Sequence, residues 1–373
     1  MENHTYFTKS YENARKAFLD KANQIILNNL EARLASHQVP SKTDSELYID
    51  TLFIPANTNP EKLIVISSAV HGIEGYVGSA IQQMFLKEIL PVLKIKNTSF
   101  LIIHSINPFG FKYHRRVTEN NVDLNRGLEQ DRKLFKSINK GYSQLNDYLN
   151  PEKKYSKRDL FHSFFILKSL TLLIRKSISS LRQAALQGQY QFPKGLYFGG
   201  MEFEPQKKIL EELLITNIQK DQKVLTIDLH TGYGKKGMLH ILQNHADETV
   251  KSITEKICND HPIHRGGKDK FYEIFGDFAE FVGQVAPLNT CIPLVFEYGT
   301  QNNLGLLGGF RAIHTMISEN QGFHHGYSNP KVEKKVKDKF LKMFYPNDKI
   351  LREGILEQTR KILPEIIENF DKI

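Results

Sequence analysis

The sequence predicts an α/β protein in which a mostly parallel, mixed β-sheet is flanked by helices. Four apolar, β-branched runs of strand length are separated by stretches with helical periodicity. This alternation is typical of βαβ units, whose crossover connections place parallel strands side by side. The four runs cover 62–70, 99–106, 224–230 and 292–297.

The stretches between these runs supply the remaining elements and the domain organisation. Helical patterns cover 9–35, 204–220 and 305–320, and a β-rich run covers 47–54. We expect a single domain over 1–373 with a mostly helical insertion at 128–200 and a charged helical tail, packed on the outside, at 331–373. The insertion could be a lid over a site or a purely structural layer, and the sequence favours neither.

Composition and charge exclude several classes of protein. A hydrophobic fraction of 40% is ordinary for a soluble globular protein and excludes disordered and fibrous classes. The net charge of +9 is compatible with acidic partners, but the basic residues are scattered apart from clusters at 153–158 and 331–339. Because no nucleic-acid-binding motif accompanies them, we interpret them as a solvated face and expect no nucleic-acid partner.

The sequence also indicates a cytoplasmic protein with no membrane partner. Cys258 and Cys291 stand in unrelated contexts and form no disulfide framework, which fits a reducing compartment. The first residues lack the basic and apolar regions of a secretory signal. The most apolar helical segment, 161–178, is interrupted by charged residues and is not expected to span a membrane.

The segment after the first buried run carries the strongest chemical signal. His71 and Glu74 form a His-x-x-Glu loop between a strand and a helical pattern. Such a loop can present an imidazole nitrogen and a carboxylate oxygen to one cation, and zinc accepts both. Since a catalytic zinc usually has three protein ligands and a water, a third ligand is needed.

The third and fourth buried runs end on residues that can complete such a site. His230 ends the third run, and Asp228 points to the same side of an extended chain, where it can orient a neighbouring ligand. A strand-end histidine alone would more commonly bond a carbonyl, but its pairing with His71 and Glu74 favours a metal ligand. Glu297 ends the fourth run. A buried carboxylate at this place requires either a salt-bridge partner or a function such as that of a general base.

A polar stretch at 111–127 is too rich in turn-forming residues to be a core helix. Its arginines, Arg115, Arg116 and Arg126, each offer a planar fork to a carboxylate, and Asn125 can donate beside them. Taken alone, the stretch is somewhat more typical of a surface loop with ordinary salt bridges.

Together these segments resemble the zinc carboxypeptidase superfamily, in which carboxypeptidase A-like exopeptidases and succinylglutamate desuccinylase- or aspartoacylase-type deacylases share a fold. The chain is most similar to a poorly characterised bacterial branch of carboxypeptidase-like proteins, and the resemblance covers about residues 45–325. It implies a three-layer sandwich of the phosphorylase/hydrolase type. The motifs that carry it are His71-Gly-Ile-Glu74, Arg115-Arg116-Val, Asn121-Val-Asp123-Leu-Asn125-Arg126, Gly195-Leu-Tyr-Phe-Gly-Gly200, Asp228-Leu-His230-Thr-Gly232 and Glu297-Tyr-Gly-Thr300.

The resemblance implies a metal centre and a general base. His71, Glu74 and His230 match the zinc ligands, so the expected cofactor is one Zn²⁺ per chain. Glu297 matches the catalytic glutamate. A glutamate in this position accepts a proton from the metal-activated water and returns it to the leaving amine.

The resemblance also implies residues that bind the substrate. Asn125 and Arg126 match the pair that holds the substrate carboxylate. Either Arg115 or Arg116 matches the arginine that polarises the scissile carbonyl, and spacing does not decide between them. The sequence departs from the superfamily in two places. Gly127 stands where asparagine is frequent, and the tyrosine that closes over substrate in the exopeptidases has only candidates here, Tyr272 and Tyr233.

These roles imply a metallocarboxypeptidase-like hydrolase that cleaves an amide or peptide bond next to a substrate carboxylate. The substrate would be a small peptide or, if the chain is a deacylase on the same fold, an N-acyl amino acid. An alternative from another class is a catalytically inactive binding protein on this fold, which the complete set of predicted ligands disfavours. The sequence does not specify the oligomeric state.

Overall fold

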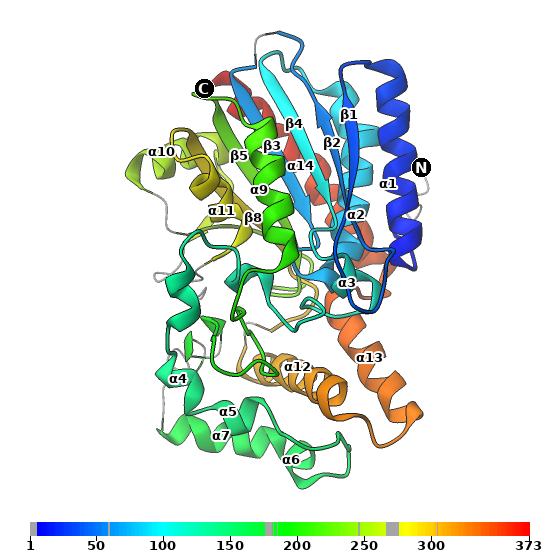
Figure 1. Ribbon diagram of the computed structural model, residues 1–373, viewed down its shortest axis with the longest axis vertical. Helices are drawn as coiled ribbons and strands as arrows, with labels where there is room; N and C mark the ends of the chain where they lie inside the picture. The colour runs from blue at the N-terminus through cyan, green and yellow to red at the C-terminus, as the bar shows by residue number, and fades with distance from the viewer. Residues whose placement is uncertain are drawn as a thin grey trace.

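A mixed β-sheet forms the centre of the molecule in the computed structural model, which describes residues 6–58, 60–175, 181, 183–184, 186–244, 247–265, 276–303 and 305–373 (Figure 1). Its strands within these residues are β1 (Arg33–Gln38), β2 (Tyr48–Ile54), β3 (Lys62–Ser68), β4 (Thr98–His104), β5 (Lys223–Thr231), β6 (Leu239–Gln243), β7 (Ile263–Arg265) and β8 (Thr290–Tyr298). They follow the order β1-β2-β4-β3-β5-β8-β6-β7. The central strands β4, β3, β5 and β8 are parallel, whereas β1–β2, β2–β4 and β6–β8 pair antiparallel. The predicted fold class is confirmed.

Helices cover both faces of the sheet and make a three-layer sandwich (Figure 1). The helices on one face are α1 (Tyr11–Asn28), α2 (Gly75–Met84), α10 (Glu248–Cys258) and α14 (Lys349–Lys372), and those on the other are α9 (Pro205–Asn217) and α11 (Phe278–Val285). Strand β3 is buried on both faces, since Ile64 and Ile66 pack into the first layer and Leu63 and Val65 into the second. This double burial explains why the strand is a continuous apolar run in the sequence.

A third hydrophobic cluster lies beyond the carboxyl ends of the central strands (Figure 1). The helices there are α4 (Lys140–Ser143), α5 (Asn146–Leu149), α6 (Leu160–Ser163), α7 (Phe165–Arg175), α12 (Leu306–His325) and α13 (Pro330–Phe344). The first four belong to the insertion 128–200, and the last two follow β8. Their packing places the insertion next to the edge where α/β sheets usually bind ligands.

One expectation about secondary structure was wrong. The helix predicted over 9–35 ends at Asn28, and the chain then enters β1, an edge strand with mostly exposed or half-buried side chains. The tail forms the helices α13 and α14, and the side chains of Leu363, Ile366 and Phe370 in α14 are fully buried. Helix α14 therefore packs an apolar stripe against the sheet as part of an outer helical layer.

The apolar stretch at 161–178 forms, in its described part, the short helices α6 and α7. Across the described residues, no helix combines the length and the apolar character that crossing a bilayer requires. Cys258 and Cys291 are free thiols, and Cys258 is buried.

Candidate metal centre

Four site residues lie together at the carboxyl ends of β3, β5 and β8. His71 follows β3, and Glu74 closes the short 3₁₀ turn η2 (Gly72–Glu74) that leads into α2. His230 and Glu297 are register partners near the ends of β5 and β8. Ala69 turns the chain out of β3 with a φ of 60°, a left-handed conformation that residues other than glycine rarely adopt. Such strained residues concentrate at functional sites.

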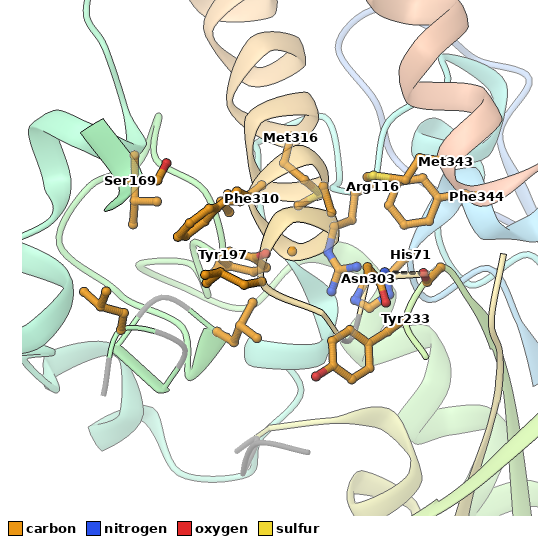
Figure 2. A pocket seen from close by; sticks show the side chains of 18 of the residues that line it. His71, Arg116, Ser169, Tyr197, Tyr233, Asn303, Phe310, Met316, Met343 and Phe344 are labelled. Carbon is orange, nitrogen blue, oxygen red and sulfur yellow. Dashed lines mark hydrogen bonds between the residues drawn. The ribbon is translucent and has the colours of Figure 1, made fainter. Parts of the chain in front are cut away.

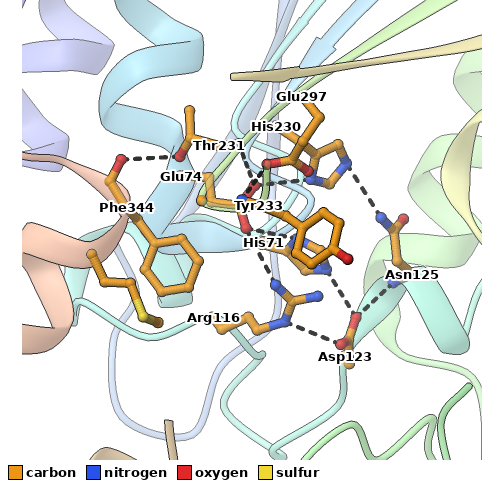
Figure 3. A network of polar contacts seen from close by, with 12 residues as sticks. His71, Glu74, Arg116, Asp123, Asn125, His230, Thr231, Tyr233, Glu297 and Phe344 are labelled. Atoms are coloured by element: carbon orange, nitrogen blue, oxygen red, sulfur yellow. Dashed lines mark hydrogen bonds and ion pairs between the residues drawn. The ribbon is translucent and has the colours of Figure 1, made fainter. Parts of the chain in front are cut away.

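His71, Glu74 and His230 converge on one point (Figure 3). One ligand atom from each residue lies within 4.8 Å of the other two, and all three side chains are buried. Nδ1 of His71 is 2.9 Å from Oε1 of Glu74, and Nδ1 of His230 is 2.9 Å from Oε2. The three residues predicted to be metal ligands are thus brought together.

The other nitrogen of each imidazole contacts a second carboxylate. Nε2 of His71 is 3.1 Å from Oδ1 of Asp123, and Nε2 of His230 is 2.6 Å from Oδ2 of Asp228. When each Nε2–H donates to its carboxylate, each neutral imidazole keeps a lone pair on Nδ1, and both lone pairs face Glu74. A divalent cation can accept these converging lone pairs, and two imidazoles with one carboxylate form a ligand set that suits zinc.

When no cation neutralises the nearby carboxylates, the same surroundings favour protonation of His230. Burial lowers the pKa of His230, but Asp228 and Glu74 outweigh it and raise that pKa well above its usual value. Burial raises the pKa of Glu74, but His71 and His230 outweigh it and lower the pKa. Metal and protons therefore compete for the same atoms.

Glu297 lies beside these residues as a buried carboxyl group (Figure 3). Its Oε1 accepts a hydrogen bond of 2.9 Å from the backbone N–H of Tyr233. Burial and the nearby Glu74 carboxylate raise the pKa of Glu297 to about 8, although His230 and Arg116 lower it. A carboxyl group that titrates near neutral pH can both accept and return a proton.

Arg116 is the arginine that reaches the centre. Its Nη1 lies 3.3 Å from Oε1 of Glu74, and its Nε lies 3.2 Å from Oδ2 of Asp123. It also lines the cavity that contains His71 and Glu297. Its positive charge is placed beside the carboxylate ligand, where a negatively charged reaction intermediate could use it.

Arg115 points elsewhere. Its Nε is 3.3 Å from Oε1 of Glu319 in α12, and its Nη2 donates to the side-chain oxygens of Asn121 and Asn320. The guanidinium also stacks on the ring of Phe323 at 3.5 Å from the centroid. The two adjacent arginines, equivalent in the sequence, therefore belong to different networks.

The predicted carboxylate-binding pair lies beside the predicted metal ligands, and both of its members are buried. Nδ2 of Asn125 is 3.2 Å from Nε2 of His230, and its Oδ1 accepts from the backbone of Phe278. Arg126 is fully buried, with Nη1 3.3 Å from Asp123 and Nη2 donating to the carbonyl of Leu186. Neither Asn125 nor Arg126 lines the cavity, so their predicted contact with substrate stays a prediction.

Of the two tyrosine candidates, Tyr233 lines the cavity, and Tyr272 lies outside the described residues. The cavity has a volume of about 220 Å³ and extends from the metal centre to the insertion and α12 (Figure 2). The insertion therefore forms one wall of the site.

Sequence reasoning missed three contributions to the site. Asp123 was recognised only as part of a motif, yet it contacts His71, Arg116 and Arg126 together. The backbone N–H of Thr231 donates to Oε2 of Glu74 at 2.9 Å, a contact that no residue type reveals. Phe344 in α13 lines the cavity from far beyond the last motif.

One family model matches most of the chain. It spans residues 7–358 and is described as "Protein of unknown function (DUF2817)". The chain belongs to this family. The expectation of a poorly characterised branch is confirmed, and no curated protein matches the sequence.

Solved structures of metallo-carboxypeptidases and desuccinylases are similar to this DUF2817 protein at low identity. Carboxypeptidase A from Helicoverpa armigera is 14% identical with a TM-score of 0.46, over 89% of this chain and 73% of that chain. A metallo-carboxypeptidase from Burkholderia cenocepacia is 12% identical with a TM-score of 0.43, over 86% and 70%. The succinylglutamate desuccinylase from Chromobacterium violaceum is 15% identical with a TM-score of 0.36, over 84% and 74%.

Proposed function

We propose that this protein is a zinc-dependent hydrolase that cleaves an amide bond next to a substrate carboxylate. The observation that carries the proposal is the convergence of His71, Glu74 and His230 within 4.8 Å, at the end of a cavity that His71, Glu74 and Glu297 line. Two histidines and one glutamate, with a position left for water, are a common composition of catalytic zinc sites.

Each residue has a task in this reaction. Zinc held by the three ligands would act as a Lewis acid and lower the pKa of a water toward about 7. Glu297 takes a proton from the attacking water and delivers it to the leaving amine. Arg116 places positive charge where the carbonyl oxygen becomes negative, an effect that can amount to about 3 kcal/mol. Asp123 and Asp228 hold the imidazoles in the tautomer that binds metal.

The substrate carboxylate is assigned to the side of the centre that carries Asn125 and the arginines. Asn125 can donate to it from its place beside His230. Arg126 can reach it only when its hydrogen bond to the carbonyl of Leu186 opens. A small peptide and an N-acyl amino acid both present a carboxylate on the amine side of the scissile bond.

Metal content and turnover of matched variants test the proposal. We expect about one zinc per chain in wild type and in Glu297→Gln, and loss of zinc in His230→Ala, because only the last change removes a ligand. Glu297→Gln should lose turnover by about 10²-fold or more on dipeptides and N-acyl amino acids, because it removes the general base. Zinc is measured by elemental analysis and turnover by amine release.

His261→Ala is the control, since His261 is a partly exposed histidine that pairs with Glu365 away from the site. It should keep both zinc and turnover. A wild-type chain that stays free of metal after zinc is added back would overturn the hydrolase and favour a binding protein on the same fold. Wild-type turnover in Glu297→Gln would remove this residue from the mechanism.

A further inference from the structure

The two ends of the cavity that contains the candidate metal centre differ in charge and polarity. Its charged and metal-binding residues are confined to the centre, whereas none of the described insertion and α12 residues that line it carries a charge. In Figure 2, Ser169 and Phe310 lie at the end away from His71 and Tyr233. The apolar side chains at that end include Leu145, Leu149, Leu172, Phe310, Ile313 and Met316.

The few hydroxyl groups at the apolar end already have partners. Oγ of Ser169 donates to the carbonyl of Phe165 at 2.7 Å and lies 2.5 Å from the hydroxyl of Tyr148. A peptide extending into this part would bury N–H and C=O groups without partners, at about 1–3 kcal/mol for each group. A hydrocarbon chain has no such groups, so it fits this lining better than a peptide does.

The cavity is also larger than one side chain requires. An apolar protein cavity of about 150 Å³ holds a benzene molecule, whereas this cavity, with its polar end included, has about 220 Å³. Met316 in α12 is a flexible lining residue that can adapt to a chain of varying length.

We propose that the substrate is an N-acyl amino acid whose acyl group is a long apolar chain, seated between the insertion and α12. This inference rests on the proposed amide hydrolysis and names its substrate class. Water adds across the amide C–N bond, so that the acyl carbon gains the oxygen and the nitrogen leaves as an amine with the proton relayed by Glu297. The products are a long-chain carboxylate and a free amino acid.

Charge decides which half of the substrate occupies the apolar end. The amino acid carries a carboxylate, which is attracted to the positive charge of Arg116 at the polar end. The group on the other side of the scissile carbonyl then points away from the arginine, toward Phe310 and Ile313. That group is the acyl chain.

A chain-length series tests the inference on the zinc-loaded, full-length chain. N-acyl alanines with acyl groups of two to sixteen carbons are compared by kcat/KM. Each methylene buried in an apolar site contributes about fourfold, so kcat/KM should rise steeply from acetyl to medium chains and level off when the cavity is full.

Ile313→Trp should lower the ratio of kcat/KM for dodecanoyl-alanine to that for acetyl-alanine by about tenfold or more, because the indole fills the space of the distal chain. Arg311→Trp is the matched control, since Arg311 is exposed on the same helix and does not line the cavity. It should leave the ratio and both rates unchanged. Calorimetric binding of dodecanoyl-alanine and acetyl-alanine to Glu297→Gln gives a second readout without turnover and without altering the cavity wall.

The outcomes separate this inference from the proposed function. Turnover that is flat or falls with chain length, or that prefers dipeptides with an apolar C-terminal residue, would overturn the acyl-chain assignment and leave the hydrolase standing. A chain that binds zinc yet hydrolyses no amide would refute the hydrolase. In that case, tighter binding of dodecanoyl-alanine than of acetyl-alanine would still support the apolar acyl site, and equal binding would overturn it.

Discussion

Asp123 connects the metal centre to the arginines. Its carboxylate contacts Nε2 of His71, Nε of Arg116 and Nη1 of Arg126, and accepts from the backbone N–H of Asn125. Burial alone would raise the pKa of Asp123, but Arg126, Arg116 and His71 hold it well below its usual value. A permanently ionised carboxylate therefore fixes the orientation of one ligand and of the arginine beside it.

Because Arg116 and Arg115 have different surroundings, we expect substitution of Arg116 to lower activity and substitution of Arg115 to lower stability. Arg116→Gln should lower kcat/KM by about 10²-fold at saturating zinc, because it removes positive charge from the reacting carbonyl. Arg115→Gln should instead lower the free energy of unfolding by about 3 kcal/mol, because it breaks a buried ion pair with Glu319. Amide hydrolysis and urea unfolding of both variants measure the contrast.

The paired variants also control for each other, since they make the same chemical change at adjacent positions. If Arg115→Gln, while fully folded, loses as much kcat/KM as Arg116→Gln, then the assignment of Arg116 to the carbonyl is wrong. Lys337 also pairs with Glu319 at 2.6 Å and can soften the loss of stability at Arg115.

At the residue scale, the convergence of the proposed metal ligands could be predicted, whereas the orientations of the arginines could not. His71, Glu74 and His230 belong to local motifs at strand ends, and strand ends of a parallel sheet meet at one edge. The orientation of Arg115 depends on Glu319 in the distant helix α12, whereas Arg116 pairs with Glu74 and Asp123, and residue type does not encode which arginine makes which contact. The burial of Arg126 likewise depends on the insertion, through Leu186.

At the scale of the elements, η2 and α3 (Pro108–Lys112) can pack closely because Gly72 has no side chain. A Cβ on Gly72 would lie 2.2 Å from the carbonyl carbon of Gly110 and 2.3 Å from the backbone nitrogen of Phe111. The backbone N–H of Gly72 donates to the carbonyl of Arg116 at 3.1 Å. The turn between two metal ligands thus packs directly on the segment that delivers Arg116.

Gly72→Ala should therefore weaken both stability and metal binding. Backbone atoms must separate to admit the methyl group, which we expect to cost about 1–3 kcal/mol of unfolding free energy and about tenfold in zinc affinity. Gly354→Ala in α14 is the control, because a Cβ there meets nothing within 4 Å. It should stabilise the chain by about 0.5–1 kcal/mol and leave zinc affinity unchanged. Equal zinc affinity in both variants would show that the turn tolerates the displacement.

Whether a strand or helix could be predicted from the sequence depended on how deeply its side chains are buried. Strands β3 and β5 are buried on both faces and could be predicted as apolar runs. Strand β1 escaped prediction because its side chains are exposed or half-buried and leave no apolar alternation. Helix α14 could be predicted as a charged amphipathic helix, but the complete burial of Leu363, Ile366 and Phe370 in its apolar stripe follows from packing on the sheet. The insertion helices α4, α5 and α6 are too short for helical periodicity to define them.

At the scale of the whole molecule, the sheet and the third hydrophobic cluster contribute different parts of the site. The parallel strands set the metal ligands at one edge, and the insertion with α12 and α13 encloses the space beyond that edge (Figure 1). The ligand set therefore follows from the sheet, whereas the shape of the cavity follows from segments that lie outside it. Substrate choice should change with the insertion while the chemistry stays the same.

We expect the stability of the whole protein to depend on the titration of one buried histidine, His104, which lies outside the site. His104, at the end of β4, is fully buried, stacks on Phe18 at 4.7 Å between ring centroids, and lies 3.1 Å from Oγ of Ser79. Burial lowers the pKa of His104 to about 4, although Asp50 raises it and Arg15 lowers it further. In the unfolded chain the pKa of a histidine is about 6.5.

Because the unfolded state binds a proton at His104 between about pH 6.5 and pH 4 while the folded state does not, acid in this window favours unfolding. His104→Gln keeps a polar group beside Ser79 and removes the titration. The free energy of unfolding of wild type minus that of the variant should be constant above about pH 7 and should fall by on the order of 3 kcal/mol between pH 6.5 and pH 4. Urea unfolding at a series of pH values measures this difference, in which the titrations of all other histidines cancel. Parallel curves would mean that the folded protein accommodates a charged His104, with Asp50 as its counterion.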